Sequence, residues 1–169
     1  MEVIINIDLK DYDNNWPIFY RTAVKGIIFC DGKILMQKSS LTGEYKIVGG
    51  VQEDNETLIE TLKREVIEES GYKVKEETIK ELGTVFEKRK DRDDEKIYLS
   101  ETYLYLCEID ISTQYPLQRT ENEIEKDQLP VFVDPQLALE TNRAHLNDYK
   151  WVDREIKILA YLIENGIVR

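Results

Sequence analysis

Alternation of hydrophobic and polar residues predicts strands in the first third of the chain. Residues 2–8 (EVIINID) alternate loosely, as a strand does. Residues 21–30 and 33–38 are hydrophobic runs separated by Asp31-Gly32, a dipeptide that suits the tight turns of β-hairpins. We therefore expect an N-terminal strand followed by a β-hairpin.

A helical period follows a glycine pair, Gly49-Gly50. Thr57 and Glu60 fit a capping box, in which each side chain hydrogen-bonds a free backbone amide of the other. Gly71 suits the left-handed cap that ends a helix. Between them an apolar stripe is formed by Leu58, Ile59, Leu62 and Val66.

The second half of the chain again predicts strands followed by helices. Residues 79–88 and 97–110 predict two strands, joined by the charged stretch FEKRKDRDDEK as a solvated hairpin tip. Residues 131–133 predict a short strand, and Asp134-Pro135 predicts a helix start. Residues 151–166 predict a C-terminal helix with a buried stripe of Trp151, Ile156, Leu159 and Ile163. The order favours an α/β fold, a mixed sheet covered by helices.

Length and composition indicate one globular domain over residues 1–169. The 169 residues are 41% hydrophobic and 34% charged, which is typical of a folded and very soluble chain. No apolar run approaches the roughly 20 residues that span a bilayer, and the N-terminus lacks the basic start of a signal peptide. Cys30 and Cys107 lie in apolar runs, as reduced core cysteines do. We expect a cytoplasmic protein without a membrane partner.

The charge balance excludes some functions. A net charge of −11 argues against a nucleic-acid polymer as partner, since such binding needs Lys and Arg to neutralise phosphates. A bound divalent cation would reverse the local sign, so a small phosphate ligand stays compatible. His145 is the single histidine, which leaves a His/Cys zinc site without its ligands.

Three glutamates crowd the end of the predicted helix. Glu65, Glu68 and Glu69 fall within about a third of the helix circumference, where like charges repel. A solvated acidic face is the ordinary interpretation of such a cluster. These carboxylates, however, border the apolar stripe, and clustered carboxylates beside a backbone carbonyl suit a hard cation such as Mg²⁺.

The same stretch resembles the Nudix box. The pattern is Gly, five residues, Glu, seven residues, Arg-Glu, an aliphatic residue, any residue, Glu-Glu, any residue, Gly. It is matched here by Gly50, Glu56, Arg64, Glu65, Val66, Glu68, Glu69 and Gly71. The departures are Tyr72, where an aliphatic residue is usual, and Val48, where a proline is common. The resemblance implies the family's α/β/α sandwich around a mixed sheet.

The resemblance also implies an activity and site residues. Nudix enzymes hydrolyse a diphosphate bond in a nucleoside diphosphate linked to another group, with Mg²⁺ or sometimes Mn²⁺. Glu65, Glu68 and Glu69 match the metal-binding glutamates, and the Gly49 carbonyl matches a backbone ligand. Glu56 matches a residue that braces the loop and sometimes assists at the metal. Arg64 matches the arginine that orients the box carboxylates; its ordinary interpretation is a surface pair with Glu60 or Glu68, and the two interpretations are compatible.

The general base stays open at this stage. It is either Glu65 or a glutamate of a mobile loop, for which the candidates are Glu121, Glu123 and Glu125. The alternative for that acidic segment is a solvated loop. Glu53 is a further accessory ligand candidate.

The substrate is the least determined feature. Lys38, Lys46 and Arg89 are candidate phosphate contacts, with Lys88 and Arg92 as further cations. Signatures of ADP-ribose, dinucleoside polyphosphate and coenzyme A hydrolases are missing from their usual places, which favours a nucleoside triphosphate or a related small nucleotide. A hydrolase of the ADP-ribose or nucleotide-sugar type is the alternative.

The sequence is also compatible with other functions of this fold and leaves two oligomeric states open. A nucleotide-sensing Nudix module would be favoured by loss of a box glutamate, and none is lost. An isomerase of this fold would need a catalytic cysteine, for which Cys30 is poorly placed. The oligomeric state is a monomer or a homodimer, since residues 1–18 could pair with a second chain or close the edge of the sheet.

Overall fold

The computed structural model describes residues 1–92 and 95–167. Its first sheet has the strand order β1-β7-β8-β2. Strand β1 is parallel to β7, β7 is antiparallel to β8, and β8 is parallel to β2, so the sheet is mixed, as predicted. Residues 93–94 of the predicted β7–β8 hairpin tip lie outside the described residues. The strands are β1 (Val3–Asp8), β2 (Ile18–Ile27), β7 (Lys80–Lys90) and β8 (Ile97–Leu106).

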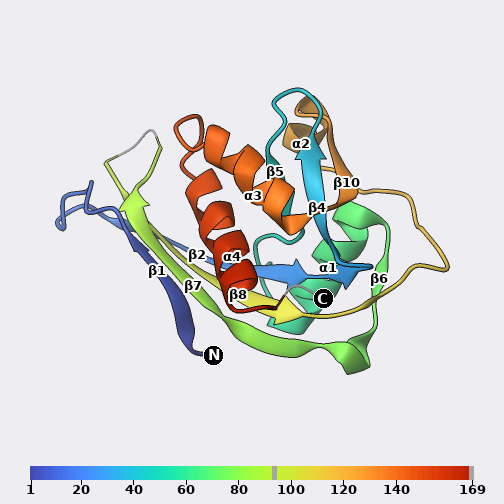
Figure 1. Ribbon diagram of the computed structural model, residues 1–169. Helices are drawn as coiled ribbons and strands as arrows, with labels where there is room; N and C mark the ends of the chain where they lie inside the picture. The colour runs from blue at the N-terminus through green and yellow to red at the C-terminus, as the bar shows by residue number, and fades with distance from the viewer. Residues whose placement is uncertain (93–94, 168–169) are drawn as a thin grey trace.

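The N-terminal strand lies at the edge of this sheet. Its residues pair with β7 of the same chain, with Asn6 opposite Phe86 and Asp8 opposite Lys88. Of the two roles expected for residues 1–18, the structure therefore has β1 covering the edge of its own sheet (Figure 1).

The second sheet has the order β10-β4-β3, with β5 also paired to β4. The predicted hairpin is shorter than expected, because only β3 pairs with β4 and the preceding residues form β2 in the other sheet. Ile27 and Ile28 are both fully buried but belong to different core clusters, so the chain passes from one sheet to the other at this point. The strands are β3 (Phe29–Cys30), β4 (Lys33–Ser39), β5 (Tyr45–Ile47) and β10 (Gln128–Val133).

Helices cover both sides of this sheet assembly (Figure 1). Helix α1 (Leu58–Ser70) buries Leu62 and Val66 in one core cluster. Helices α3 (Pro135–Ala144) and α4 (Val152–Glu164) bury the other face. The remaining short elements are β6 (Lys73–Val74), η1 (Glu76–Thr78), β9 (Ile109–Asp110) and α2 (Glu121–Glu125). Among the described residues, none of the helices has the length and hydrophobicity needed to span a bilayer.

The buried face of α4 differs from the predicted stripe. Trp151, Ile156 and Ile163 are only partly buried, and the buried residues are Val152, Glu155, Ile158, Leu159 and Leu162. The buried face of α4 is rotated relative to the predicted stripe because it includes Glu155, a charged residue that hydropathy alone would assign to the solvent side. The Glu155 carboxylate lies 3.0 Å from Lys25 Nζ and accepts a hydrogen bond of 2.9 Å from the Ile47 amide.

The glycine pair joins the two sheets beside α1. Val24 N donates to Gly50 O at 2.9 Å and Gly26 N donates to Val48 O at 3.0 Å. Gly49 has φ +133°, and a Cβ there would overlap the Val24 carbonyl oxygen. The close approach of these backbones therefore requires glycine at position 49.

Candidate active site

Helix α1 has the predicted caps, and they fix where its carboxylates point. Thr57 and Glu60 form the reciprocal capping box, and Gly71 ends the helix at φ +76°. Glu65 and Glu69, one turn apart, face the glycine pair. Gly49 N donates to Glu69 Oε2 at 2.6 Å, and a Cβ on Gly50 would overlap the Glu65 carboxylate. The second glycine of the pair thus leaves room for a box glutamate.

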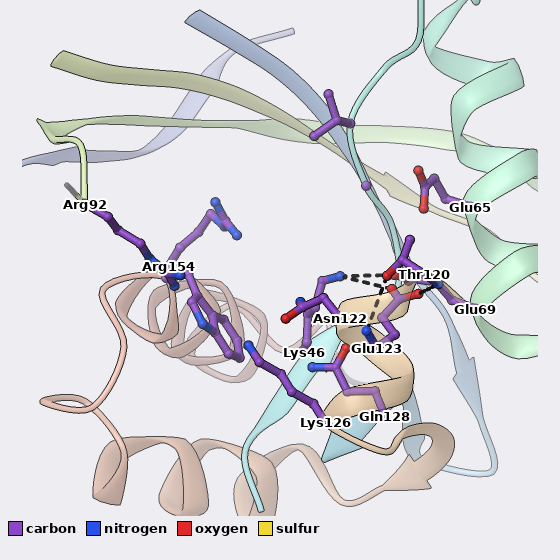
Figure 2. Close-up of a pocket in the computed structure, with 13 residues that line it drawn as sticks. Lys46, Glu65, Glu69, Arg92, Thr120, Asn122, Glu123, Lys126, Gln128 and Arg154 are labelled. Carbon is purple, nitrogen blue, oxygen red and sulfur yellow. Dashed lines mark hydrogen bonds and ion pairs between the residues drawn. The ribbon is translucent and has the colours of Figure 1, made fainter. Parts of the chain in front are cut away.

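A lysine and a second acid meet Glu69 from other elements. Lys46 Nζ on β5 lies 3.0 Å from Glu69 Oε1 and 3.9 Å from Glu123 Oε1 on α2 (Figure 2). Glu69 is 3% exposed, and burial raises its pKa to about 7. Although burial opposes it, the Glu69 carboxylate raises the pKa of Lys46, so the ammonium stays charged between the two acids.

Arg64 holds the other box carboxylates. Its Nε lies 2.6 Å from Glu56 Oε1, and its Nη1 lies 2.8 Å from Glu65 Oε1 and 3.2 Å from Glu68 Oε2. The Arg64 hydrogen bonds lower the pKa of Glu56 to about 2. Of the two surface partners expected for Arg64, it therefore contacts Glu68, whereas Glu60 is engaged in the helix cap. Glu56 braces the loop before α1 through Arg64 and through Thr61 Oγ1 at 2.9 Å.

The expected loop glutamates lie on the short helix α2 rather than in a structureless loop. Thr120 and Glu123 form a second capping box, and Glu123 is buried while Glu121 and Glu125 are exposed. The Thr120 amide donates to Glu123 Oε2 at 2.8 Å, which leaves the other oxygen toward Lys46. The sequence signal was present, since Thr-x-x-Glu at 120–123 is the same motif as at 57–60.

Residues 111–120, which precede α2, are attached to the end of α1. Tyr115 N donates to Gly71 O at 2.7 Å, and Gln118 N donates to Glu68 O at 2.9 Å. These bonds fix Thr120 and Glu123 against the helix that carries the box glutamates.

Two adjoining pockets share the carboxylate wall formed by Glu65, Glu69 and Glu123. The first has a volume of about 360 Å³ and is lined by Lys46, Gly50, Val51, Glu65, Glu69, Arg92, Thr120, Asn122, Glu123, Lys126, Gln128, Trp151 and Arg154 (Figure 2). The second, of about 270 Å³, is lined by Val51, Gln52, Glu53, Arg64, Glu65, Glu68, Glu69, Gln118, Thr120 and Glu123. The first volume lies within the usual range of small-molecule sites.

The structure separates the three cations that we expected to contact phosphate. Lys46 lines the first pocket. Lys38 and Arg89 are not among the residues that line either of these two pockets. Arg89 is buried, with Nε 2.7 Å from Glu87 Oε1 and its guanidinium 4.1 Å from the centroid of the Tyr98 ring. The Arg89 charge is paired with Glu87 inside the protein, and the sequence pattern does not indicate this burial.

Several pocket residues escaped the sequence analysis. Lys126, Gln128 and Arg154 were not considered, and Trp151 was interpreted as core. Lys126 caps the end of α2, Gln128 begins β10, and Trp151 and Arg154 lie at the start of α4. The packing of these three elements brings the residues to the pocket, and no local motif marks them.

The donor set fits a hard divalent cation. Glu65 and Glu69 offer carboxylate oxygens to the pockets, and burial raises the pKa of both. Such a desolvated acidic pair would be stabilised by a positive ion. Within the described residues, no group of three or more His, Cys, Asp or Glu side chains is arranged to hold a metal. Mg²⁺ needs no such cage, because it commonly binds through one or two carboxylates, waters and substrate phosphates.

A mixed sheet between helices, with a capped glutamate-rich helix against a glycine pair, defines the class of protein. The NUDIX domain family model matches residues 19–155, and the chain belongs to this family. It is a Nudix hydrolase, an enzyme that acts on phosphoric anhydride bonds. Nudix hydrolases generally need a divalent metal, typically Mg²⁺. No curated protein matches the chain.

Solved structures of other proteins are similar to this chain at low sequence identity. A Nudix hydrolase from Nitrosomonas europaea is 16% identical, with 74% of this chain and 79% of that chain covered and a TM-score of 0.50. A MutT Nudix hydrolase from Burkholderia pseudomallei is 19% identical over 70% and 85% of the two chains, with a TM-score of 0.48. An ADP-ribose pyrophosphatase from Streptococcus suis is 14% identical over 69% and 75%, with a TM-score of 0.44.

Proposed function

We propose that this protein is a Mg²⁺-dependent pyrophosphohydrolase that cleaves a nucleoside diphosphate linked to another group, with a nucleoside triphosphate or a related small nucleotide as the substrate. The observation that carries the proposal is the shared wall of Glu65, Glu69 and Glu123 between the two pockets. A diphosphate at this wall would meet the carboxylates, and a nucleoside would extend into the first pocket.

Glu65 and Glu69, with the Gly49 carbonyl and Glu68 beside them, are the residues proposed to hold the metal. When bound, Mg²⁺ neutralises phosphate oxygens and acidifies an attacking water. Arg64 keeps Glu65 and Glu68 oriented through its hydrogen bonds at 2.8 and 3.2 Å. Glu56 is proposed to act through Arg64 rather than directly.

Glu123 is the proposed general base among the three glutamates around α2. It is the one of the three that lines the pocket, and its carboxylate faces Glu69 across Lys46. A carboxylate in that position could accept a proton from water. Lys46 is proposed to hold Glu69 in place and to meet a phosphate oxygen. Glu65 is the alternative base.

The test is a panel of nucleoside triphosphates, nucleotide sugars, ADP-ribose and dinucleoside polyphosphates, incubated with Mg²⁺, with Mn²⁺ or with a chelator. We expect metal-dependent release of a nucleoside monophosphate from at least one member. Tight binding of a panel member without metal-dependent product would contradict the proposal and favour a nucleotide-sensing module. Preferred cleavage of ADP-ribose or a nucleotide sugar would select the alternative substrate class.

A further inference from the structure

The first pocket is electrically asymmetric. Figure 2 shows Glu65 and Glu69 on one side and the side chains of Arg92, Arg154 and Lys126 on the other. The chain has 34 acidic and 23 basic residues, so a group of cations in one hollow runs against the charge of the whole molecule. Such a focused positive region attracts an anion.

The cations of the first pocket differ in whether they already form ion pairs with carboxylates of the protein. Lys46 pairs with Glu69, and Arg154 Nη1 lies 3.0 Å from Glu87 Oε2 with its Nε 3.4 Å from Glu155 Oε1. Within the part of the chain that the structure describes, Arg92 and Lys126 form no ion pair. Lys126 Nζ instead lies 5.4 Å from the centroid of the Tyr149 ring. Among the described residues, these two cationic groups therefore have no carboxylate partner and are available to meet a ligand.

Between the acidic and basic sides the pocket offers groups suited to a planar base. Trp151 lines it and packs on Tyr149, with ring centroids 6.0 Å apart and an interplanar angle of 25°. Gln128 also lines it, is 4% exposed, and has a buried Oε1 without a hydrogen-bond partner in the described residues. A buried amide oxygen without a partner is costly, and a ligand donor would satisfy it.

We infer that the preferred substrate carries a second anionic group, a phosphate monoester on the nucleoside, remote from the diphosphate that is cut. The diphosphate lies at Glu65 and Glu69, the base packs against Trp151 beside Gln128, and the additional phosphate meets Arg92 and Lys126. This inference rests on the proposed function for the placement of the diphosphate. It concerns binding alone and adds no chemical step.

The test measures binding without turnover. Adenosine 5′-monophosphate is compared with adenosine 2′,5′- and 3′,5′-bisphosphate, none of which contains a diphosphate. The Trp16→Phe variant leaves Trp151 as the single tryptophan of the chain, so quenching of its fluorescence reports occupancy of this pocket. We expect one bisphosphate to bind about fivefold more tightly than the monophosphate, which is the upper end of what a partly exposed charge pair gives.

Two double variants test the residues. Arg92→Gln/Lys126→Gln is expected to remove most of the preference for the bisphosphate. Lys33→Gln/Lys80→Gln removes the same charge from exposed positions outside the pocket, and this control variant should keep the preference for the bisphosphate. Equal affinity for all three nucleotides in the parent protein, or an equal loss of preference in both variants, would overturn the inference.

Hydrolysis separates this inference from the proposed function. NADH and NADPH share one diphosphate and differ by a ribose phosphate, as do dephospho-coenzyme A and coenzyme A. A bisphosphate preference with no metal-dependent cleavage of any nucleotide would remove the proposed function and keep the anion site. Metal-dependent cleavage without any bisphosphate preference would keep the proposed function and remove the anion site.

Discussion

Lys46 Nζ lies 3.0 Å from Glu69 Oε1, and this contact ties strand β5 to the end of helix α1. The Gly49 amide holds the second oxygen of the same carboxylate at 2.6 Å. Glu69 is therefore fixed from two directions at a point where both pockets meet. A carboxylate so constrained is prepared to bind an ion in one geometry, with little reorganisation.

Replacement of Glu69 should separate activity from stability. We expect Glu69→Gln to keep the fold and to lower kcat by about 100-fold or more, because an amide is neutral and a poor magnesium ligand. Circular dichroism and steady-state turnover on the panel substrate check this. Glu140→Gln, at an exposed position on α3, is the matched control. Turnover at the parent rate in Glu69→Gln would mean that the metal is held elsewhere.

The acids around α2 can be distinguished by their burial. We expect Glu123→Gln to lower kcat by about 10²-fold or more, as loss of a general base does. Glu125→Gln, exposed on the same helix, should keep the parent rate. Single-turnover assays at saturating substrate make the comparison. Equal rates in the two variants would return the role of base to Glu65.

The two glycines of the pair should respond differently to alanine. Gly49→Ala places a Cβ on the Val24 carbonyl oxygen at a positive φ, so we expect a loss of about 3 kcal/mol or more in unfolding free energy. Gly50→Ala meets the flexible end of Glu65, so it should cost little stability while it displaces that carboxylate and lowers turnover. Urea denaturation and activity, measured on both variants, check the contrast. The same stability loss in both would contradict it.

The buried pair of Lys25 and Glu155 should contribute strongly to the fold. Both side chains are almost fully buried, at 3.0 Å, so Glu155→Gln leaves an uncompensated buried ammonium. We expect a loss of about 3–5 kcal/mol. Lys157→Met, which breaks the surface pair with Asp153 on the same helix, should cost less than about 1 kcal/mol. Denaturant titration measures both, and similar losses would argue against the buried pair.

The two cysteines should differ in reactivity with pH. Burial raises the pKa of Cys107 to about 12, so in the native state its thiol stays protonated as the pH rises from 7 to 9.5. Because the unfolded thiol ionises near 9, Cys107 favours the native state below that pH, and its contribution is lost as the pH rises toward 12. We expect iodoacetamide to label Cys30 first and Cys107 only after denaturant is added. Mass spectrometry of the parent protein and of Cys30→Ser distinguishes the sites.

Local signals made the first half of the site predictable. Thr57 with Glu60, Gly71 and the spacing of the three glutamates are all readable within 15 residues, and the structure has the helix caps as expected. Thr120 with Glu123 carries the same information, but the acidic composition of its surroundings favoured a solvated loop. The helix was missed because composition was given more weight than a motif with a definite hydrogen-bonding pattern.

The remaining residues of the site are brought together by long-range packing. Lys46 meets Glu123 across 77 positions of the sequence, and Trp151 reaches the same pocket from α4. No spacing rule encodes such encounters, because they depend on how β5, β10 and α4 stack. Arg89 shows how a short-range contact can also escape a sequence-based expectation, since Glu87, two positions earlier, holds its side chain inside the protein.

The attachment of residues 111–120 to the end of α1 has a consequence for how this enzyme could diversify. Helix α1, which carries the box glutamates, and the polypeptide that lines the first pocket are separate stretches, joined at Gly71–Tyr115 and Glu68–Gln118 by backbone bonds that do not depend on side-chain identity. Grafting a different stretch between those anchor points and Val133, with Thr120 and Glu123 retained, would exchange ligand preference while the proposed hydrolytic residues stayed in place. Chimaeric proteins built at these junctions offer a direct route to new selectivities.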